Sequence, residues 1–210
     1  MTENTNSGVL ASAGTGDKVV IVKYNAGNIQ SVLFALERIG VQAIVTDDKE
    51  SILSADKIIF PGVGEASTAM NYLKERNLDQ VIRSAKQPLL GICLGMQLLC
   101  NHSEENDTKC LGLFDVDVRK FTSKTLKIPQ IGWNNIQVKD HPIFKGVPNN
   151  SYCYFVHSYY AELSDSSIAT SNYEIDFSCA LAKDNFYGVQ FHPEKSAETG
   201  EQILKNFLSL

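Results

Sequence analysis

Short apolar runs alternate with helical patterns through the first half of this 210-residue chain. Strands are predicted where a brief apolar run is bounded by turn-forming residues, at 18–23, 43–46 and 57–60. Helices are predicted where apolar residues recur every three or four positions, at 29–39, 66–74 and 78–85. A further strand follows Pro88 and leads into Cys93. This alternation indicates a parallel sheet with helices on both faces.

The pattern changes from about Gly112 onward, where short β-type segments follow one another. The run 152–160 is rich in aromatic residues and strongly favours a strand. Three more strands are predicted, at 167–172, 177–182 and 187–191, and a final helix at 197–208. We therefore predict an α/β fold: an open, mostly parallel central sheet flanked by helices, with an antiparallel or mixed extension in the C-terminal half.

Residues 1–17 lack this patterning and are rich in Thr, Ser, Asn and Gly. We expect a flexible tail there, followed by one domain over 18–210. The tail has neither the basic start nor the apolar stretch of a secretory signal. The net charge of −5 argues against general nucleic-acid binding. No apolar run approaches the roughly 20 residues that a membrane span requires.

The cysteines and histidines are scattered along the chain. The five cysteines are odd in number and irregularly spaced, which indicates a reducing cytoplasm rather than a disulfide framework. The four histidines form no ligand spacing, so we predict neither a metal site nor a cofactor.

Cys93 lies in Gly-Ile-Cys-Leu-Gly, between an apolar segment and a helical pattern. A cysteine placed there would sit on a sharp strand-to-helix turn with its sulfur exposed. The glycines let the backbone turn without a Cβ clash, and the helix N-terminus favours the thiolate. The alternative is a buried cysteine that acts as a small apolar residue.

His192 and Glu194 supply a base and a carboxylate two residues apart. Pro193 favours an extended conformation at His192, which places the two side chains on one face. Glu194 would then orient the imidazole ring while the other ring nitrogen faces Cys93, as in a catalytic triad. Alone, this segment is more typical of a surface turn than of a catalytic site. Both segments follow strands, and open α/β sheets bind ligands at the carboxyl ends of strands.

A second glycine-rich turn, Pro61-Gly62-Val63-Gly64, also follows a predicted strand. Glycine would let the Gly62–Val63 peptide point its N–H into the site. Together with the Leu94 N–H it would hold the oxyanion of a tetrahedral intermediate, and such a donor contributes about 10²–10³ in rate. An ordinary turn is the alternative.

Three motifs in this order resemble the class I (triad) glutamine amidotransferases: Pro-Gly-Val-Gly, Gly-Ile-Cys-Leu-Gly-Met-Gln and Phe-His-Pro-Glu-Lys. Three further runs narrow the resemblance to the HisH family, the glutaminase subunits of imidazole glycerol phosphate synthase in histidine biosynthesis. They are residues 24–30, 131–134 and 154–159. The resemblance covers about residues 18–210, which is the whole chain except the tail.

The resemblance implies that Cys93 attacks the side-chain amide of free glutamine, that His192 and Glu194 manage the protons, and that water releases glutamate. It implies that Gln97 and Glu105 hold the substrate, although both could be exposed polar residues. Ammonia would pass to a separate cyclase, a (β/α)₈-barrel subunit, in a heterodimer.

The resemblance also implies a set of residues that face this partner: Asn28, Trp133, Tyr154, His157 and Lys195. Trp133 and Tyr154 could equally be core aromatic residues, and Asn28 could be only a helix N-cap. Gln130 departs from the family, which usually has a basic residue just before Ile-Gly-Trp-Asn. That departure questions any charge-dependent role at this position and leaves the triad untouched.

Three other functions compete with this one. A glutaminase of another pathway is opposed by the Ile-Gly-Trp-Asn and Phe-Val-His-Ser-Tyr runs. A cysteine peptidase or γ-glutamyl hydrolase would act alone and need no partner-facing surface. A non-catalytic module with the same fold is opposed by the presence of Cys93, His192 and Glu194.

Overall fold

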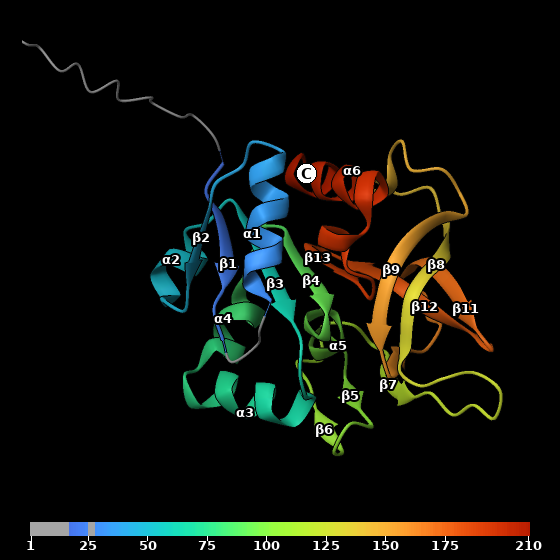
Figure 1. The fold of residues 1–210 in the computed structure, drawn as a ribbon. Coiled ribbons are helices and arrows are strands. Elements are labelled where there is room, and N and C mark those ends of the chain that lie inside the picture. The colour runs from blue at the N-terminus through green and yellow to red at the C-terminus, as the bar shows by residue number, and fades with distance from the viewer. Residues whose placement is uncertain (1–16, 25–27) are drawn as a thin grey trace, which may run out of the picture.

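The computed structural model describes residues 17–24 and 28–210, which form a sheet of 13 strands with helices packed against it (Figure 1). The parallel part of the sheet has five strands, in the order β2 (Ala43–Thr46), β1 (Val19–Val22), β3 (Lys57–Gly62), β4 (Leu89–Cys93) and β13 (Phe186–Val189). Each neighbouring pair runs parallel, and Gly62 is in register with Cys93. The ends of β3 and β4 therefore lie side by side.

Helices cover both faces of the parallel part, because its strands are buried on both sides. Along β1, Val20 and Val22 join one core cluster, while Val19 and Ile21 join the other. The first cluster includes buried residues of α2 (Lys49–Leu53), α3 (Ala66–Glu75), α4 (Leu78–Ser84) and α5 (Leu94–Leu99). The second includes buried residues of α1 (Ile29–Arg38) and α6 (Ala197–Leu208).

The rest of the chain extends the sheet with mostly antiparallel strands, of which β8, β9, β11 and β12 are seen as curved ribbons beside the parallel part in Figure 1. From β13 the order continues through β12 (Ile175–Lys183), β10 (Tyr159–Ala161), β7 (Asp117–Lys120), β5 (His102–Ser103) and β6 (Thr108–Lys109). A branch leaves β12 through β11 (Ser167–Tyr173), β8 (Gln130–Val138) and β9 (Ser151–His157). Two short 3₁₀ helices, η1 (Pro142–Phe144) and η2 (Pro193–Lys195), complete the fold.

The predicted fold class is confirmed, and the predicted helices at 29–39, 66–74, 78–85 and 197–208 all form within one or two residues of their expected bounds. Other parts of the chain differ from the prediction. Where short β-type segments are expected after Gly112, residues 130–138 form one nine-residue strand, β8, and the aromatic run is divided at Ser158 into β9 and β10. The helix α2 and the hairpin β5–β6 were not predicted.

Two predictions concern residues without a described structure. Residues 1–16 of the predicted tail and residues 25–27 of the first loop lie outside the described part of the chain. The division into a tail and one domain over 18–210 stays a prediction. Among the residues that are described, no helix is long and apolar enough to cross a membrane.

Candidate active site

Cys93 ends β4 and directly precedes α5, so the predicted strand-to-helix turn is present. Its backbone has φ 55° and ψ −113°, a region that residues with a Cβ rarely occupy. Such strain costs about 1–3 kcal/mol and persists only where the surroundings impose it. The expected exposure of the sulfur is wrong, because Cys93 is only 7% exposed, although it faces a cavity.

The glycines around Cys93 have no room for a Cβ. A Cβ on Gly95 would lie 1.9 Å from the Phe60 carbonyl oxygen, and one on Gly91 would lie 2.8 Å from the Met96 nitrogen. Neither glycine has a positive φ. The expectation that glycine avoids a Cβ clash at this turn is therefore confirmed, and the same glycines let the first turn of α5 lie directly against β3 and β4.

His192 and Glu194 follow β13, next to the end of β4 in the sheet. His192 Nδ1 and Glu194 Oε1 are 2.8 Å apart, and both side chains are buried. The predicted extended tripeptide is only partly formed, because Pro193 begins the 3₁₀ helix η2. The expected His192–Glu194 contact is thus made across one 3₁₀ turn rather than along an extended strand.

His192 has a strongly shifted pKa. Burial opposes protonation of His192, but hydrogen bonds with Cys93 and Glu194, and the charges of both, outweigh burial and raise the pKa of His192 well above its ordinary value. The imidazole therefore holds its proton in the resting site. A protonated imidazole beside a sulfur nucleophile is the acid that a departing amine requires.

A cavity of about 320 Å³ joins these groups, a size suited to a small ligand. It is lined by residues from several parts of the chain, among them Val63, Cys93, Leu94, Gln97, Glu105 and His192. Glu194 is absent from this lining and lies behind His192. The predicted nucleophile, base, substrate-binding pair and two of the three predicted oxyanion residues thus share one cavity.

Gln97 lies on α5 and is 4% exposed. Its Nε2 is 2.9 Å from the Tyr159 carbonyl oxygen and 2.8 Å from Gln190 Oε1. A backbone carbonyl only accepts hydrogen bonds, so the Gln97 nitrogen is fixed there and both its N–H groups are used. The Gln97 oxygen is left to accept a hydrogen bond from a ligand.

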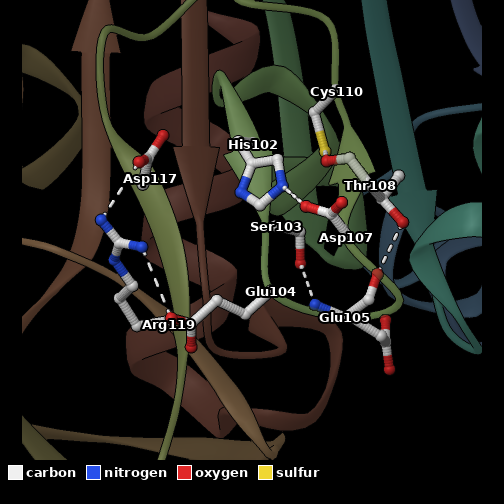
Figure 2. A network of polar contacts seen from close by, with 9 residues as sticks. All are labelled: His102, Ser103, Glu104, Glu105, Asp107, Thr108, Cys110, Asp117 and Arg119. Carbon is white, nitrogen blue, oxygen red and sulfur yellow. Dashed lines mark hydrogen bonds and ion pairs between the residues drawn. The ribbon is translucent and has the colours of Figure 1, made fainter.

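Glu105 lies in the turn between β5 and β6, a hairpin held by its own polar contacts (Figure 2). The Glu105 N–H donates to Ser103 Oγ at 3.2 Å, and the Thr108 hydroxyl donates to the Glu105 carbonyl at 2.6 Å. The Glu105 carboxylate accepts the Ala66 N–H at 2.7 Å, at the start of α3. Burial raises the pKa of Glu105, the Ala66 N–H opposes this, and the charge of Glu65 adds to it.

The same hairpin is tied to the sheet by Arg119 of β7 (Figure 2). Arg119 forms ion pairs with Glu104, Asp117 and Glu162, at 3.4, 3.2 and 3.1 Å. The guanidinium is partly exposed, so these pairs contribute little to stability individually. Asp117 and Glu162 hold the guanidinium in place, and the guanidinium in turn pairs with Glu104, the residue before Glu105.

The predicted oxyanion residues surround the end of β3. Gly62 pairs in register with Cys93, and a Cβ on Gly62 would lie 2.4 Å from the Tyr24 hydroxyl and 2.6 Å from the Gly95 nitrogen. Val63 and Leu94 line the cavity. The positions suit the predicted roles, which stay predictions.

Four of the five predicted partner-facing residues lie at least partly exposed. Trp133 is 53% exposed and pairs across strands β8 and β9 with Tyr154. Lys195 is exposed, with its Nζ 5.9 Å from the centre of the Tyr154 ring. Asn28 is half-buried, and its side chain accepts from Ser31 Oγ rather than capping the backbone of α1.

His157 differs from these four because its side chain is 6% exposed. Its Nδ1 is 2.7 Å from the Tyr159 carbonyl and its Nε2 is 2.9 Å from Gln130 Oε1. Burial lowers the pKa of His157 to about 4, the Tyr159 carbonyl opposes this, and the charge of His192 adds to it. The geometry places His157 in the wall of the cavity rather than on an open surface.

Two contacts of the nucleophile were not predicted from the sequence. Cys93 Sγ lies 3.7 Å from the Val156 carbonyl oxygen and 3.7 Å from Gln190 Nε2. Gln190 precedes His192 by two residues, and alternation along an extended segment could have revealed it. No sequence signal identifies the carbonyl of Val156.

The other cysteines are free and buried: Cys100, Cys110, Cys153 and Cys179. Within the described residues, no group of three or more His, Cys, Asp or Glu side chains could hold a metal ion.

The family model for "Glutamine amidotransferase class-I" matches residues 20–210. The curated protein "Imidazole glycerol phosphate synthase subunit HisH" of Bacteroides thetaiotaomicron is 54% identical, over 92% of this chain and 100% of its own. The protein of the same description from Shewanella oneidensis is 47% identical, over 95% of this chain and 99% of its own.

Solved structures show the same fold at low identity. PurLQS of Thermotoga maritima has a TM-score of 0.69 at 18% identity, covering 92% of this chain and 98% of its own. A glutamine amidotransferase of the same organism gives 0.61 at 19% identity, covering 91% and 82%.

Proposed function

The chain belongs to the class I glutamine amidotransferase family, as a HisH-type subunit of imidazole glycerol phosphate synthase, and we propose that Cys93, His192 and Glu194 are the catalytic triad of its glutaminase reaction. The observation that carries this assignment is the buried 2.8 Å contact between His192 Nδ1 and Glu194 Oε1, with His192 facing Cys93 in one cavity. Family membership supports the reaction, and this contact supports the assignment of these three residues to it.

In the proposed reaction, Cys93 Sγ attacks the side-chain amide carbon of free glutamine. The protonated His192 gives its proton to the departing ammonia, and a glutamyl thioester remains on Cys93. Water then attacks the thioester while His192 accepts a proton, which releases glutamate. Glu194 stabilises the imidazolium and fixes its tautomer, as the orienting carboxylate does in other triads.

The oxyanion of each tetrahedral intermediate would form beside the Leu94 N–H and the peptide at Gly62–Val63. Both flank the cavity at the ends of β3 and β4. A backbone donor stabilises the oxyanion most when it needs no reorganisation during the reaction.

The substrate is proposed to bind through its free amino group. The Gln97 oxygen and the Glu105 carboxylate are both hydrogen-bond acceptors in the cavity wall, and two acceptors suit an ammonium group. Peptide-bound glutamine lacks this ammonium group and would be rejected. This requirement separates the proposed glutaminase from a peptidase.

The partner is proposed to be a (β/α)₈-barrel cyclase subunit that receives the ammonia, in the cytoplasm. The proposed docking surface consists of Trp133, Tyr154, Lys195 and Asn28. Trp133 and Tyr154 pack edge to face with ring centres 6.0 Å apart, and the large exposed fraction of Trp133 favours burial against another protein. His157 is left out, because its side chain is already buried.

The test is glutamate release from glutamine by the isolated chain, and by the chain with a cognate cyclase subunit plus its nucleotide ligand. We expect low activity alone and strong stimulation in the mixture. Equal activity in both conditions would indicate a free-standing hydrolase and contradict the partner proposal.

The docking surface has its own test. We expect Trp133→Ala to weaken binding to the cyclase subunit by about tenfold or more, since exposed tryptophans are typical hot spots. Ile44→Ala is the matched control, because Ile44 is 51% exposed on the edge strand β2, far along the sheet from β8 and β9. Equal affinities for the two variants would refute the proposed surface.

A further inference from the structure

Gln190 connects the nucleophile to the substrate-binding side chain. It is completely buried, its Nε2 lies 3.7 Å from Cys93 Sγ, and its Oε1 lies 2.8 Å from Gln97 Nε2. Its own backbone N–H donates to the Cys179 carbonyl at 2.9 Å, which anchors it to β12. The amide of Gln190 therefore contacts both the predicted nucleophile, Cys93, and the predicted substrate-binding residue, Gln97.

The direction of these hydrogen bonds follows from one fixed acceptor. The Tyr159 carbonyl can only accept, so the atom facing it at 2.9 Å is the nitrogen of Gln97. The second N–H of that nitrogen needs an acceptor, which must be the oxygen of Gln190. The nitrogen of Gln190 is then the atom that faces Cys93 Sγ, and it donates a hydrogen bond to it.

We propose that Gln190 is a positioning residue of the glutaminase reaction: it donates an N–H to Cys93 Sγ, which stabilises the thiolate, and it orients the amide of Gln97 toward the substrate. This proposal rests on the glutaminase function proposed above. An N–H donor to an anion forms one of the stronger kinds of hydrogen bond, and this one lies in a water-poor site.

The other polar groups named around Cys93 differ from this donor. The Val156 carbonyl accepts, so it favours a thiol rather than a thiolate. His192, paired with Glu194, stabilises the thiolate only while it is protonated, and it transfers that proton during the reaction. The buried Tyr24 hydroxyl has no hydrogen-bond partner in the described part of the chain, and it lies against Gly62. Among the side chains that contact the sulfur within the described residues, only Gln190 carries a donor that never titrates.

The experiment compares Gln190→Met with Gln80→Met. Methionine keeps the length of glutamine and removes the amide oxygen and nitrogen, while Gln80 is exposed on α4 and its side chain donates to its neighbour Asp79. The rate at which iodoacetamide alkylates Cys93 is measured against pH by mass spectrometry, and thermal unfolding reports folding. The kcat and KM for glutamine are measured in the complex with the cyclase subunit.

For Gln190→Met we expect the pH midpoint of Cys93 alkylation to rise by about one unit. We expect kcat to fall about tenfold, because a shift of one pH unit and a tenfold change in rate correspond to the same free-energy difference. Gln80→Met should match the unchanged protein in both. Gln190→Asn is the second variant: it keeps the amide but shortens its reach by one methylene, so it should show the same rise in midpoint.

An unchanged alkylation midpoint and kcat in folded Gln190→Met and Gln190→Asn would overturn the proposal and leave Gln190 a packing residue. Failure of the proposed function is a different result. If the unchanged protein with its partner releases no glutamate, the glutaminase assignment fails, whereas the alkylation profiles still report on the Gln190–Cys93 contact.

Discussion

The ends of β3 and β4 lie side by side, and they are built in opposite ways. After β4, the backbone of Cys93 is strained, Gly95 has no room for a Cβ, and the sulfur has neighbours on several sides. After β3, Gly64 has φ 107° and nothing within 4 Å of the place where a Cβ would lie. The nucleophile is closely surrounded, and the segment beside it has open space at Gly64.

This difference suggests that the two segments have different roles in the site, one holding the nucleophile and the other supplying a backbone donor. A nucleophile must be held closely, because a small misplacement lowers the rate greatly. A backbone donor next to an unconstrained glycine can rotate at little cost. We therefore expect a partner to change the activity through the segment after β3 and to leave the turn at Cys93 unchanged. Substitutions in the two segments and at the buried His157 test how closely each part of the site is held.

Cys93→Ala should have the largest effect and lower glutamate release by at least about 10⁴-fold, since loss of a covalent nucleophile removes the reaction path. Folding should be preserved, because alanine fits the same space. The measurement is glutamate release by the complex, with thermal unfolding as the control. Residual activity within tenfold of the unchanged protein would exclude Cys93 as the nucleophile.

Gly62→Ala should destabilise the chain by about 2–3 kcal/mol, because the new methyl would meet the Gly95 nitrogen as well as the Tyr24 hydroxyl. Gly95 cannot retreat, since it packs against the Phe60 carbonyl. Denaturant unfolding measures the change. A cost below about 0.5 kcal/mol would show that the packing between β3 and α5 is looser than these distances indicate.

The two histidines of the site offer a test by pH. The pKa of His157 is lowered to about 4 in the folded chain, below its unfolded value of about 6.5. Between these values the unfolded chain binds the proton and the folded chain does not, so stability falls as pH drops through this window. In His157→Asn, the free energy of unfolding should therefore fall by up to about 3 kcal/mol less over this window than in the unchanged chain.

Unfolding free energies at pH 7 and pH 4.5 measure this effect. His192 has the opposite sign: its pKa is raised, so its contribution is present below pH 6.5 and is lost as pH rises through the folded pKa. An identical pH dependence in His157→Asn and the unchanged chain would contradict the neutral, buried state of His157.

Gly64→Ala should have the smallest effect, about 1 kcal/mol, because the added methyl meets no neighbour and only the positive φ is unfavourable. The same unfolding assay compares it with Gly62→Ala, two residues earlier in the chain. If Gly64→Ala lowered the free energy of unfolding more than Gly62→Ala, the inference that Gly62 is closely packed and Gly64 is not would be contradicted.

Periodicity was enough to predict the parallel half, because strands buried on both faces and amphipathic helices leave strong local signals. It failed for α2, a five-residue helix too short to show a period, which begins where Asp48 accepts the Ser51 N–H. It also failed for the hairpin β5–β6, whose strands have two residues each and are held by polar contacts.

For the site, the motifs predicted that Cys93, His192 and Glu194 lie together at one edge of the sheet, since each follows or ends a strand. They could not place His157, because its burial depends on β8 and β9, which pair only through the tertiary fold. They also missed Gln190, whose role depends on a contact with Cys93 across 97 residues of chain.

The most direct test of the central claim is identification of the covalent intermediate. The complex is mixed with isotope-labelled glutamine, quenched in acid within the first turnover, digested and analysed by mass spectrometry. The account predicts a labelled glutamyl group on the peptide that contains Cys93 and on none that contains the other four cysteines. Rapid glutamate release without any label on Cys93, or label on another cysteine, would contradict it.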